Sequence, residues 1–379
     1  MIYKPFGNTG ISLSALGFGA MRLPMASESR VDDEKAIPLM QKAFELGVNY
    51  IDTAPYYCGK DSERAVGLAL KGWRDTVYLS TKNPATDSKD GKWRKNLETS
   101  LKNLDTEYID FYHFWGIDLE SFEEMRKPGG PVDDAWKALE EGLIKHLCFS
   151  FHDKEAANMK PIIDSGLFTS VLCQYNLLDR ANEDNIAYAK QHGLGVIIMG
   201  PVGGGRLGAP SAAVQALLQN KVASSAEMAL RFVLANPNVN MALSGMQNEQ
   251  MLEENVKVAS IGGLLSEEER NQVSAMLDEN KRLMDLYCTG CNYCMPCPQK
   301  LNIPHLFRLM NYHKVYKLTD YAKAEYQKTT IPLDDRKADW EKSSGVDVSQ
   351  CIECGACEAK CPQKLEIIKQ LKETQKALG

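Results

Sequence analysis

The chain has little of what marks a membrane protein or a nucleic-acid-binding protein. None of its 379 residues lies in an apolar run that approaches the ~18 consecutive residues of a membrane-spanning helix. Its formal net charge of −6 offers no basic balance for nucleic acid or for an anionic membrane surface. Residues 1–13 are polar and lack the apolar centre of a secretory signal. We therefore expect a cytoplasmic protein with no membrane and no nucleic acid as partner.

Cysteine, by contrast, is abundant and unevenly placed. Eight of the eleven cysteines fall in two runs near the C-terminus. The first run is Cys288, Cys291, Cys294 and Cys297, and the second is Cys351, Cys354, Cys357 and Cys361. Each run is a Cys-x2-Cys-x2-Cys core with a fourth Cys followed by proline, which is the spacing of ligands around an iron-sulfur cube. The sequence therefore predicts two [4Fe-4S] clusters.

The fourth cysteine of each run is expected to serve the other cluster, as in two-cluster ferredoxins. Cys361 would then join the first three cysteines of the first run. Cys297 would join Cys351, Cys354 and Cys357. The sequence Cys-Pro-Gln-Lys-Leu-x-Ile recurs after both fourth cysteines, which supports two equivalent half-sites. The first run departs from the usual pattern, since two residues rather than three precede its last Cys, and this weakens the assignment of that ligand.

Two other roles for these runs stay open at this point. Disulfides form in oxidising compartments, which an N-terminus without a signal does not indicate. Structural zinc also takes four cysteines, but its Cys-x2-Cys pairs are usually separated by a longer loop. The remaining cysteines, Cys58, Cys148 and Cys173, are isolated in sequence, and we expect small buried apolar side chains there.

Apolar segments with β-propensity alternate with amphipathic helical segments from about residue 15 to residue 258. The expected strands are 15–19, 48–52, 77–81, 109–114, 146–150, 170–174, 195–199 and 239–243. The expected helices include 34–46, 93–101, 134–141, 154–164, 182–191, 224–234 and 249–258. Eight successive β-then-α units predict a closed (β/α)8 TIM barrel rather than an open doubly wound sheet.

Two domains are expected. Residues 1–283 would form the barrel, in which 2–13 make a hairpin that plugs one end and 259–283 lead to the first Cys run. Residues 284–379 would form a small, mostly helical ferredoxin-like domain around the clusters. Within it, 305–329 predicts an amphipathic helix and 338–346 a looser segment.

A barrel places its functional residues just after the carboxyl ends of its strands. The motifs that stand there are Tyr50-Ile51-Asp52-Thr53-Ala54-Pro55-Tyr56-Tyr57, Leu79-Ser80-Thr81-Lys82, and Ser244-Gly245-Met246 running to Glu254-Asn255. This context resembles the aldo-keto reductase family, and with its Cys runs the whole chain is similar to the iron-sulfur-tailed members found in bacteria and archaea. The resemblance implies a nicotinamide-dependent oxidoreductase that acts on a small carbonyl compound.

The resemblance also implies how the central residues act. Tyr57 would donate a proton to the carbonyl oxygen as hydride reaches the carbon. A free phenol has a pKa of about 10, and the ammonium of Lys82 would favour the phenolate. Asp52 would hold Lys82 charged and oriented. An ordinary Asp-Lys pair beside a packed Tyr is the structural alternative, since ion pairs also occur at such rims.

The fourth position of the family's catalytic set departs from the usual pattern. The usual His falls on Trp115, and His113 stands two residues earlier on the same strand face. Either His113 reaches the substrate oxygen from a deeper layer, or Trp115 offers only its indole N–H and a flat apolar wall. His113 as a satisfied core residue is the structural alternative. Within the family, loss of this His accompanies altered chemistry, including reduction of an alkene next to a carbonyl.

Only some of the residues that bind the nucleotide in this family have counterparts at the same positions of this chain. By the resemblance, Ser150 contacts the nicotinamide carboxamide, and Gln174 would replace a glutamine whose usual position holds Leu172. The loop with Gly203, Gly204 and Gly205 resembles the pyrophosphate loop, where glycine lets backbone N–H groups approach phosphate.

After the last strand, the resemblance assigns the nucleotide to Ser244, Gly245 and Met246 and its adenine to Glu254 and Asn255. No Lys or Arg stands between positions 244 and 254 to pair with a 2′-phosphate. We therefore expect NADH to be favoured over NADPH. Arg206 or Lys257 could reverse that preference.

Two functions are carried forward. One is the reductase; the other is an iron-sulfur electron-transfer module, whose barrel docks a redox partner protein. A nicotinamide gives two electrons as hydride whereas a cluster takes one, and the sequence has no Gly-x-Gly-x-x-Gly for a flavin that would convert them. The clusters are therefore expected to be structural, to position the substrate, or to act with an external redox partner.

Overall fold

The computed structural model describes residues 1–153, 155–177, 179–202, 224–261, 265–275, 294–314, 317–329, 347–361 and 365–379. These fall into two compact units. One unit comprises Met1–Gly205 and Ala229–Glu267, and the other comprises Arg206–Met228 and Glu268–Gly379. No helix in the described part of the chain is both long and apolar enough to cross a membrane.

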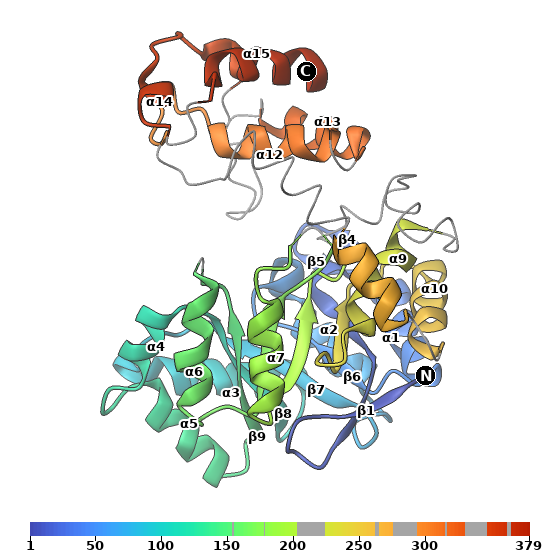
Figure 1. Ribbon diagram of the computed structural model, residues 1–379. Coiled ribbons are helices and arrows are strands. Elements are labelled where there is room, and N and C mark those ends of the chain that lie inside the picture. The colour runs from blue at the N-terminus through green and yellow to red at the C-terminus, as the bar shows by residue number, and fades with distance from the viewer. Residues whose placement is uncertain are drawn as a thin grey trace. The chain divides into compact units, whose positions relative to one another are not determined.

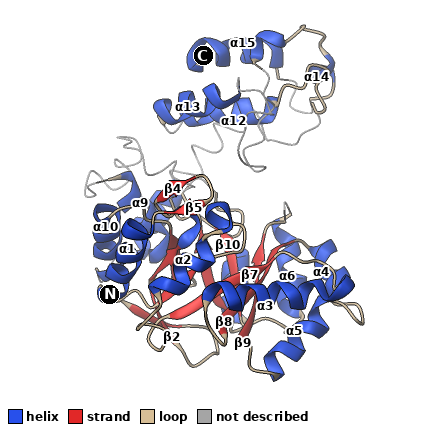
Figure 2. Ribbon diagram, turned by 180° about the vertical axis from the view of Figure 1, so that it is seen from behind, coloured by secondary structure: helices blue, strands red, loops and turns tan. Residues whose placement is uncertain are grey.

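The first unit is built on a closed barrel of eight parallel strands, which Figure 2 shows in red within a ring of helices. The strands are β3 (Leu16–Gly19), β6 (Tyr50–Asp52), β7 (Tyr78–Asn83), β8 (Ile109–Ile117), β9 (Ile144–Phe151), β10 (Ser170–Gln174), β11 (Gly195–Met199) and β12 (Met241–Ser244). Each pairs with its neighbours in chain order, and β12 closes on β3. The predicted (β/α)8 barrel is confirmed, with all eight strands at their expected places.

Helices follow the strands and cover the outside of the barrel (Figure 1). They are α1 (Asp33–Glu45), α2 (Ser62–Ala69), α3 (Lys92–Leu104), α4 (Leu119–Met125), α5 (Pro131–Glu140), α6 (Met159–Asp164), α7 (Glu183–Gln191), α9 (Ser225–Ala235) and α10 (Glu249–Ser260). The pattern of apolar residues missed α2 and α4. Apart from Glu63 and Val66, the buried residues of α2 are small, and a Cβ on its Gly67 would lie 2.4 Å from the backbone oxygen of Leu104. Such a face packs by close backbone approach and gives only a weak hydrophobic period.

The N-terminal hairpin plugs one end of the barrel, as predicted. Strands β1 (Tyr3–Pro5) and β2 (Ser12–Ser14) pair in antiparallel fashion. Between them Phe6 is fully buried and meets the Phe111 ring edge-on at 5.3 Å. A Cβ on Gly195 would lie 2.3 Å from the Phe6 ring, so glycine is required there. The interior core around Phe6 also includes Leu172, so this side chain of β10 points into the barrel.

A second hairpin, which the sequence did not reveal, follows β3. A short 3-10 helix, η1 (Ala20–Arg22), leads into β4 (Met25–Ser27) and β5 (Arg30–Val31). Another short 3-10 segment, η2 (Tyr57–Lys60), lies between β6 and α2. These segments all belong to the carboxyl end of the strands, where a barrel carries its site.

The second unit is helical where it is described. Its elements are α12 (Ile303–Lys314), α13 (Thr319–Thr329), η9 (Val348–Gln350), α14 (Ala356–Ala359) and α15 (Ile367–Leu378). The single helix predicted over 305–329 is two helices, since Lys317 between them has a left-handed φ of 55° that no helix continues through. Helices α12 and α13 pack together and against α15. The looser segment expected at 338–346 lies outside the described residues.

Candidate active site

A buried ion pair stands at the centre of the site. Asp52 ends β6, Lys82 lies on neighbouring β7, and each side chain is only 2 % exposed. Lys82 Nζ donates to Asp52 Oδ1 and, over 2.8 Å, to the backbone oxygen of Thr53. Burial alone would lower the pKa of Lys82, but Asp52 and Tyr57 together outweigh it and raise that pKa. Lys82 is therefore a fixed positive charge.

Tyr57, at the start of η2, lies over this charge. Lys82 Nζ is 5.0 Å from the centre of the Tyr57 ring. Burial raises the pKa of the Tyr57 phenol, and the Lys82 ammonium pulls it down by less. The expected effect of Lys82 is thus present, but enclosure of the ring outweighs it. Tyr57 keeps its proton at neutral pH, as a proton donor must.

A hydrogen-bonded chain continues from the ion pair into the barrel. Ser80 Oγ donates to Asp52 Oδ2 over 2.7 Å and lies 3.3 Å from His113 Nδ1. Since the one hydroxyl proton of Ser80 goes to Asp52, His113 Nδ1 carries the proton in the second contact. Burial first, and then the charge of Lys82, lower the pKa of His113 to about 3. His113 is therefore neutral, fully buried, and without a partner for Nε2 among the described residues.

Trp115 occupies a different place from His113 although both lie on β8. It is partly exposed, and its ring meets Tyr57 edge-on at 5.7 Å and Tyr56 at 5.5 Å between ring centres. His113 has no exposed surface and pairs in register with Lys82. Trp115 thus lies beside the Tyr57 ring, and which of the two residues meets the substrate stays a prediction.

Ser150 and Gln174 stand at the ends of β9 and β10. Ser150 Oγ accepts from the Gly116 N–H over 2.7 Å, and its own proton has no acceptor in the described part of the chain. A free hydroxyl donor there fits the oxygen of a carboxamide. The Gln174 amide lies against Gly200, where an added Cβ would be 2.8 Å from Gln174 Oε1. Leu172, one layer deeper, belongs to the apolar core.

The residues expected at the adenosine end of the nucleotide lie in two different environments after β12. Asn255 Nδ2 donates to Ser244 Oγ over 3.1 Å, and both side chains are buried. Met246 is also buried. Glu254 instead lies exposed on α10 and accepts from Gln250 Nε2 over 2.9 Å. The glycine-rich loop with Gly203, Gly204 and Gly205, and Arg206 after it, lie outside the described residues.

Arg22 stands next to this segment and was missed by the sequence analysis. A Cβ placed on Gly245 would lie 3.8 Å from Arg22 Cβ. Arg22 is exposed and forms no ion pair or hydrogen bond with another described residue. A cation thus borders the stretch in which the sequence has none. Arg22 comes directly after the first barrel strand. Because the carboxyl ends of the strands carry the site of a barrel, this position could have pointed to Arg22 in the sequence.

Two further polar residues near the centre were also missed. Ser80 lies two residues before Lys82 on β7, so the alternation of a strand places both on one face. His152 follows β9, and its Cδ2 would be 3.8 Å from a Cβ on Gly116. Burial and then the Lys82 charge lower the pKa of His152, so its imidazole is near the same site.

In the second unit, four predicted cluster ligands line one small cavity. They are Cys297, Cys351, Cys354 and Cys357. Their thiols do not converge as the ligands of a single ion do, and no other set of three His, Cys, Asp or Glu among the described residues does so. A cube is larger than an ion and holds its thiolates farther apart. The donor set fits an iron-sulfur cluster, and the ligation itself stays a prediction.

The other cysteines divide as follows. Cys288 and Cys291 lie outside the described residues, while Cys294 and Cys361 are partly buried. Cys148 and Cys173 are buried, and burial raises their pKa values to about 11 and about 12, so neither is a ready nucleophile. The half-buried Cys58 points its Sγ at the backbone oxygens of Ala20 and Met21, at 3.5 and 3.4 Å.

Comparison with known proteins agrees with this architecture. Residues 15–278 match the aldo/keto reductase family, and residues 287–366 match the 4Fe-4S dicluster domain. L-galactose dehydrogenase of Arabidopsis thaliana is 28% identical over 309 residues, which cover 74% of this chain and 95% of that protein.

Solved structures of the same fold are similar to the first unit. Aldo-keto reductase AKR11C1 from Bacillus halodurans, in its holo form, has a TM-score of 0.61 and 26% identity and covers 73% of this chain and 96% of its own. An aldo/keto reductase from Klebsiella pneumoniae, solved with NADP and acetate, has a TM-score of 0.58 and 23% identity, covering 72% and 94%. The expected preference for NADH finds no support among these relatives. With its matching barrel and its cysteine-rich C-terminal unit, the chain belongs to the aldo/keto reductase family and carries a C-terminal 4Fe-4S dicluster domain.

Proposed function

We propose that the protein transfers hydride between a nicotinamide cofactor and a small carbonyl compound: an aldehyde, a ketone, a sugar-derived carbonyl or an enone. The observation that carries this proposal is the buried Asp52–Lys82 pair with the protonated Tyr57 over it. A neutral phenol beside a fixed cation can release a proton to an oxygen that gains negative charge.

The nicotinamide supplies the hydride when it is bound. The chain supplies the rest. Tyr57 donates the proton, and Lys82 stabilises the phenolate that remains. Asp52 keeps Lys82 charged, and its second oxygen is held by Ser80. Trp115 forms an apolar wall beside Tyr57, which would favour a flat or apolar substrate face.

The nucleotide contacts are inferred from polar side chains at the strand ends, among which the Ser150 hydroxyl keeps a proton that has no acceptor in the described part of the chain. Ser150 would donate to the carboxamide, with Gln174 beside it, and the Ser244–Asn255 pair would face the adenosine end. The absence of cations between positions 244 and 254 favours NADH, and Arg22 is the neighbouring cation that would favour NADPH. Dissociation constants of both cofactors for the native chain and for Arg22→Ala decide between them. A loss of NADPH binding alone would assign Arg22 to the 2′-phosphate.

For the second unit we propose two [4Fe-4S] clusters with crossed ligands. Cys351, Cys354, Cys357 and Cys297 would hold one, and Cys288, Cys291, Cys294 and Cys361 the other. A redox partner protein is required only if the clusters exchange electrons, and the reducing conditions that clusters need would be met in the cytoplasm. Anaerobic iron and sulfide analysis with EPR tests the number and type of clusters.

Tyr57→Phe is the test of the proposed reaction, with Tyr56→Phe as its matched control. Tyr56 is adjacent but 57% exposed. The probes are 4-nitrobenzaldehyde, acetone and 2-cyclohexenone with NADH and NADPH under anaerobic conditions. Tyr57→Phe should abolish turnover and leave cofactor binding intact, while Tyr56→Phe keeps most of the activity. Unchanged turnover in Tyr57→Phe contradicts the mechanism.

A native chain that binds no nicotinamide but whose clusters accept electrons reversibly from a ferredoxin would be an electron-transfer module instead.

A further inference from the structure

The turn that follows Tyr57 is held in an uncommon conformation. Cys58, Gly59 and Lys60 have φ values of 51°, 64° and 74°, so three successive residues are left-handed. Only glycine adopts this region without a steric cost. The turn would relax toward ordinary backbone if nothing held it, and Tyr57 would move with it. The surroundings of the turn therefore matter for the placement of the phenol.

Two neighbouring segments enclose the turn. A Cβ on Gly59 would lie 2.5 Å from Ser29 Cα and 2.7 Å from the Glu28 oxygen, so the β4–β5 hairpin rests directly on this glycine. On the side of η1, Cys58 Sγ lies 3.4 Å from the Met21 oxygen. Both contacts are close, and neither has the directionality of a charged hydrogen bond.

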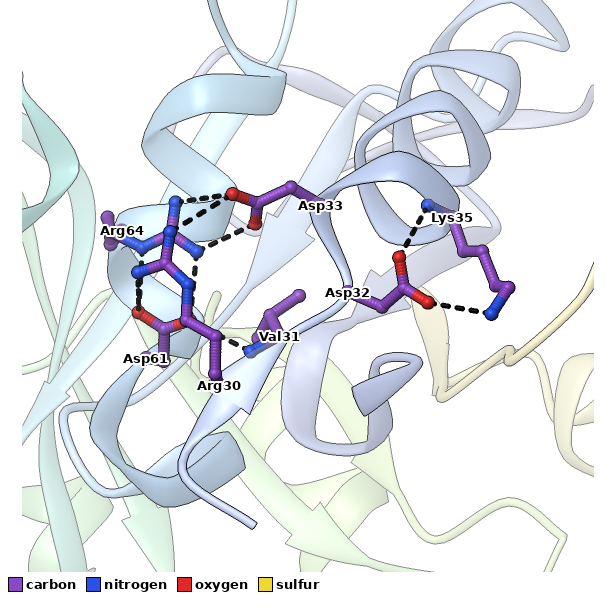
Figure 3. A network of polar contacts seen from close by, with 7 residues as sticks. All are labelled: Arg30, Val31, Asp32, Asp33, Lys35, Asp61 and Arg64. Carbon is purple, nitrogen blue, oxygen red and sulfur yellow. Dashed lines mark hydrogen bonds and ion pairs between the residues drawn. The ribbon is translucent and has the colours of Figure 1, made fainter. Parts of the chain in front are cut away.

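The end of the turn is tied down by a network of ion pairs (Figure 3). Arg64 Nε and Nη2 donate to the two oxygens of Asp61 over 2.7 and 2.8 Å. Arg64 Nη1 and Nη2 donate to both oxygens of Asp33 over 3.1 and 2.7 Å. The Val31 N–H also donates to Asp61 Oδ2 over 2.9 Å, and Arg30 pairs with both acids at 3.3 and 3.2 Å.

The network differs from an ordinary surface ion pair. Asp61 precedes α2 directly, yet its carboxylate makes no capping bond to that helix and is used on Arg64 and Val31 instead. The Asp61 side chain is 12% exposed, and the bonds from Arg64 hold its pKa below the ordinary value. Two bidentate forks on one guanidinium fix direction as well as charge. Asp61 is thereby joined to α1, to β5 and to α2.

We propose that Arg64 and Asp61 are positioning residues for Tyr57. Together they hold the left-handed turn in place, and the turn sets the phenol over Lys82 and against Trp115. The kinetic part of this proposal rests on the proposed function, because Tyr57 must be the proton donor for its position to affect turnover. The placement of the turn itself can be measured without any turnover.

The test uses the full chain with its clusters, under anaerobic conditions, in three variants. Arg64→Ala removes both forks, and Arg64→Lys keeps the charge but loses the forks. Lys35→Ala is the matched control, because Lys35 pairs with the adjacent Asp32 and has no bond to Asp61 (Figure 3). With 4-nitrobenzaldehyde, Arg64→Ala should lower kcat about 10- to 100-fold, as expected for a displacement of about 1 Å at a catalytic group. KM for the nicotinamide should change less than about twofold, since the fold of the nucleotide segment is untouched.

Alkylation of Cys58 by N-ethylmaleimide, followed by peptide mass spectrometry, reports the turn directly. Cys58 is half-buried within the turn, so release of the turn in Arg64→Ala should speed its alkylation about tenfold. Arg64→Lys should fall between Arg64→Ala and the native chain in both assays, and Lys35→Ala should match the native chain. Should Arg64→Ala fail to fold, Arg64→Lys against Lys35→Ala carries the test.

Three results overturn the proposal. One is a kcat of Arg64→Ala equal to that of Lys35→Ala; another is an unchanged alkylation rate of Cys58 in Arg64→Ala; the third is an equal rise in alkylation in Lys35→Ala. If the native chain reduces no carbonyl probe, the proposed function fails. The alkylation rates then decide alone whether the network holds the turn.

Discussion

The ion pair of the barrel and the cysteines of the second unit are both assembled from separate segments, but they are held in different ways. Asp52, Lys82 and Ser80 are buried and bonded to one another across two neighbouring strands. Cys351 is partly exposed and Cys354 is exposed, and both line a cavity without bonding to each other. The first site is preorganised by the protein, whereas the second would need a bound group to draw its cysteines together.

The barrel and the second unit also differ in the size of their hydrophobic cores. The barrel buries rings such as Trp93, Tyr112 and Phe149 completely. The described part of the second unit rests on three helices of 11 or 12 residues each, α12, α13 and α15. A helical unit this small has a limited core, and structural groups usually supplement it. The comparison predicts that the barrel folds without its cofactor and that the second unit does not.

The largest expected effect follows from breaking the barrel's ion pair. Lys82→Met leaves Asp52 buried without its counter-charge and removes the cation beside Tyr57. Turnover should fall at least about 10³-fold, and the free energy of unfolding should fall by about 3–5 kcal/mol. Steady-state kinetics and urea unfolding measure the two losses. Lys60→Met is the control, since Lys60 is an exposed lysine in η2, the segment that begins with Tyr57. A Lys82→Met enzyme with near-native kcat would show that the preorganised pair is not part of the chemistry.

The next effect tests whether the second unit depends on its clusters. Cys354→Ser removes one predicted ligand, and the iron content should fall from about eight to about four atoms per chain, because one of two cubes is lost. Helix content of the second unit should fall with it, while barrel strands keep their protection in hydrogen exchange. Cys58→Ser should leave the iron content unchanged. Loss of protection in the barrel strands as well would break the contrast between the two units.

The pH dependence of stability gives a smaller, directional effect. The pKa of His113 is about 3 in the folded barrel, below the ~6.5 of an unfolded His. Between these values the unfolded chain binds a proton that the folded chain does not. The stabilising contribution of neutral His113 is therefore present above about pH 6.5 and is lost as pH falls, by about 1.4 kcal/mol per pH unit.

The variant His113→Leu isolates this contribution. The difference in unfolding free energy between pH 7.5 and pH 5.5 should be about 1 kcal/mol larger for the native chain than for the variant. Urea unfolding followed by tryptophan fluorescence under argon measures it. Equal differences in the two proteins would mean that folding does not lower the pKa of His113, and the layer below the ion pair would then carry charge at pH 5.5.

The sequence predicted the barrel well because its strands are short apolar runs with clear period, such as Ser170–Gln174 and Gly195–Met199, whose bounds were predicted without error. Asp52 and Lys82 were expected at one rim because a barrel brings its strand ends together, and the resemblance to the aldo-keto reductase family added Tyr57 to them. What the sequence could not show is which layer a strand residue occupies. His113 and Trp115 lie on one face of β8, yet His113 is fully buried whereas Trp115 lies against the Tyr57 ring.

The support around the site was also invisible in the sequence. Arg64 and Asp61 are three residues apart, which predicts a common helical pair and nothing more. Asp33, the other partner of Arg64, lies 31 residues before it, and only the fold brings the two together. The left-handed turn after Tyr57 was equally hidden, because Cys58 and Lys60 are residues that seldom adopt such backbone.

The smallest expected effect probes the preorganised site at its edge. Ser80→Ala removes one hydrogen bond to Asp52 Oδ2 but leaves Asp52 Oδ1 bonded to Lys82. The loss of a single bond of this kind is worth about 1 kcal/mol, so kcat should fall roughly fivefold with little change in KM for the nicotinamide. Because His113 Nδ1 also loses its acceptor, the variant should be less stable by a similar amount. A loss of activity as large as that of Lys82→Met would mean that Asp52 is oriented chiefly by Ser80, and the ion pair alone would then not suffice to preorganise the site.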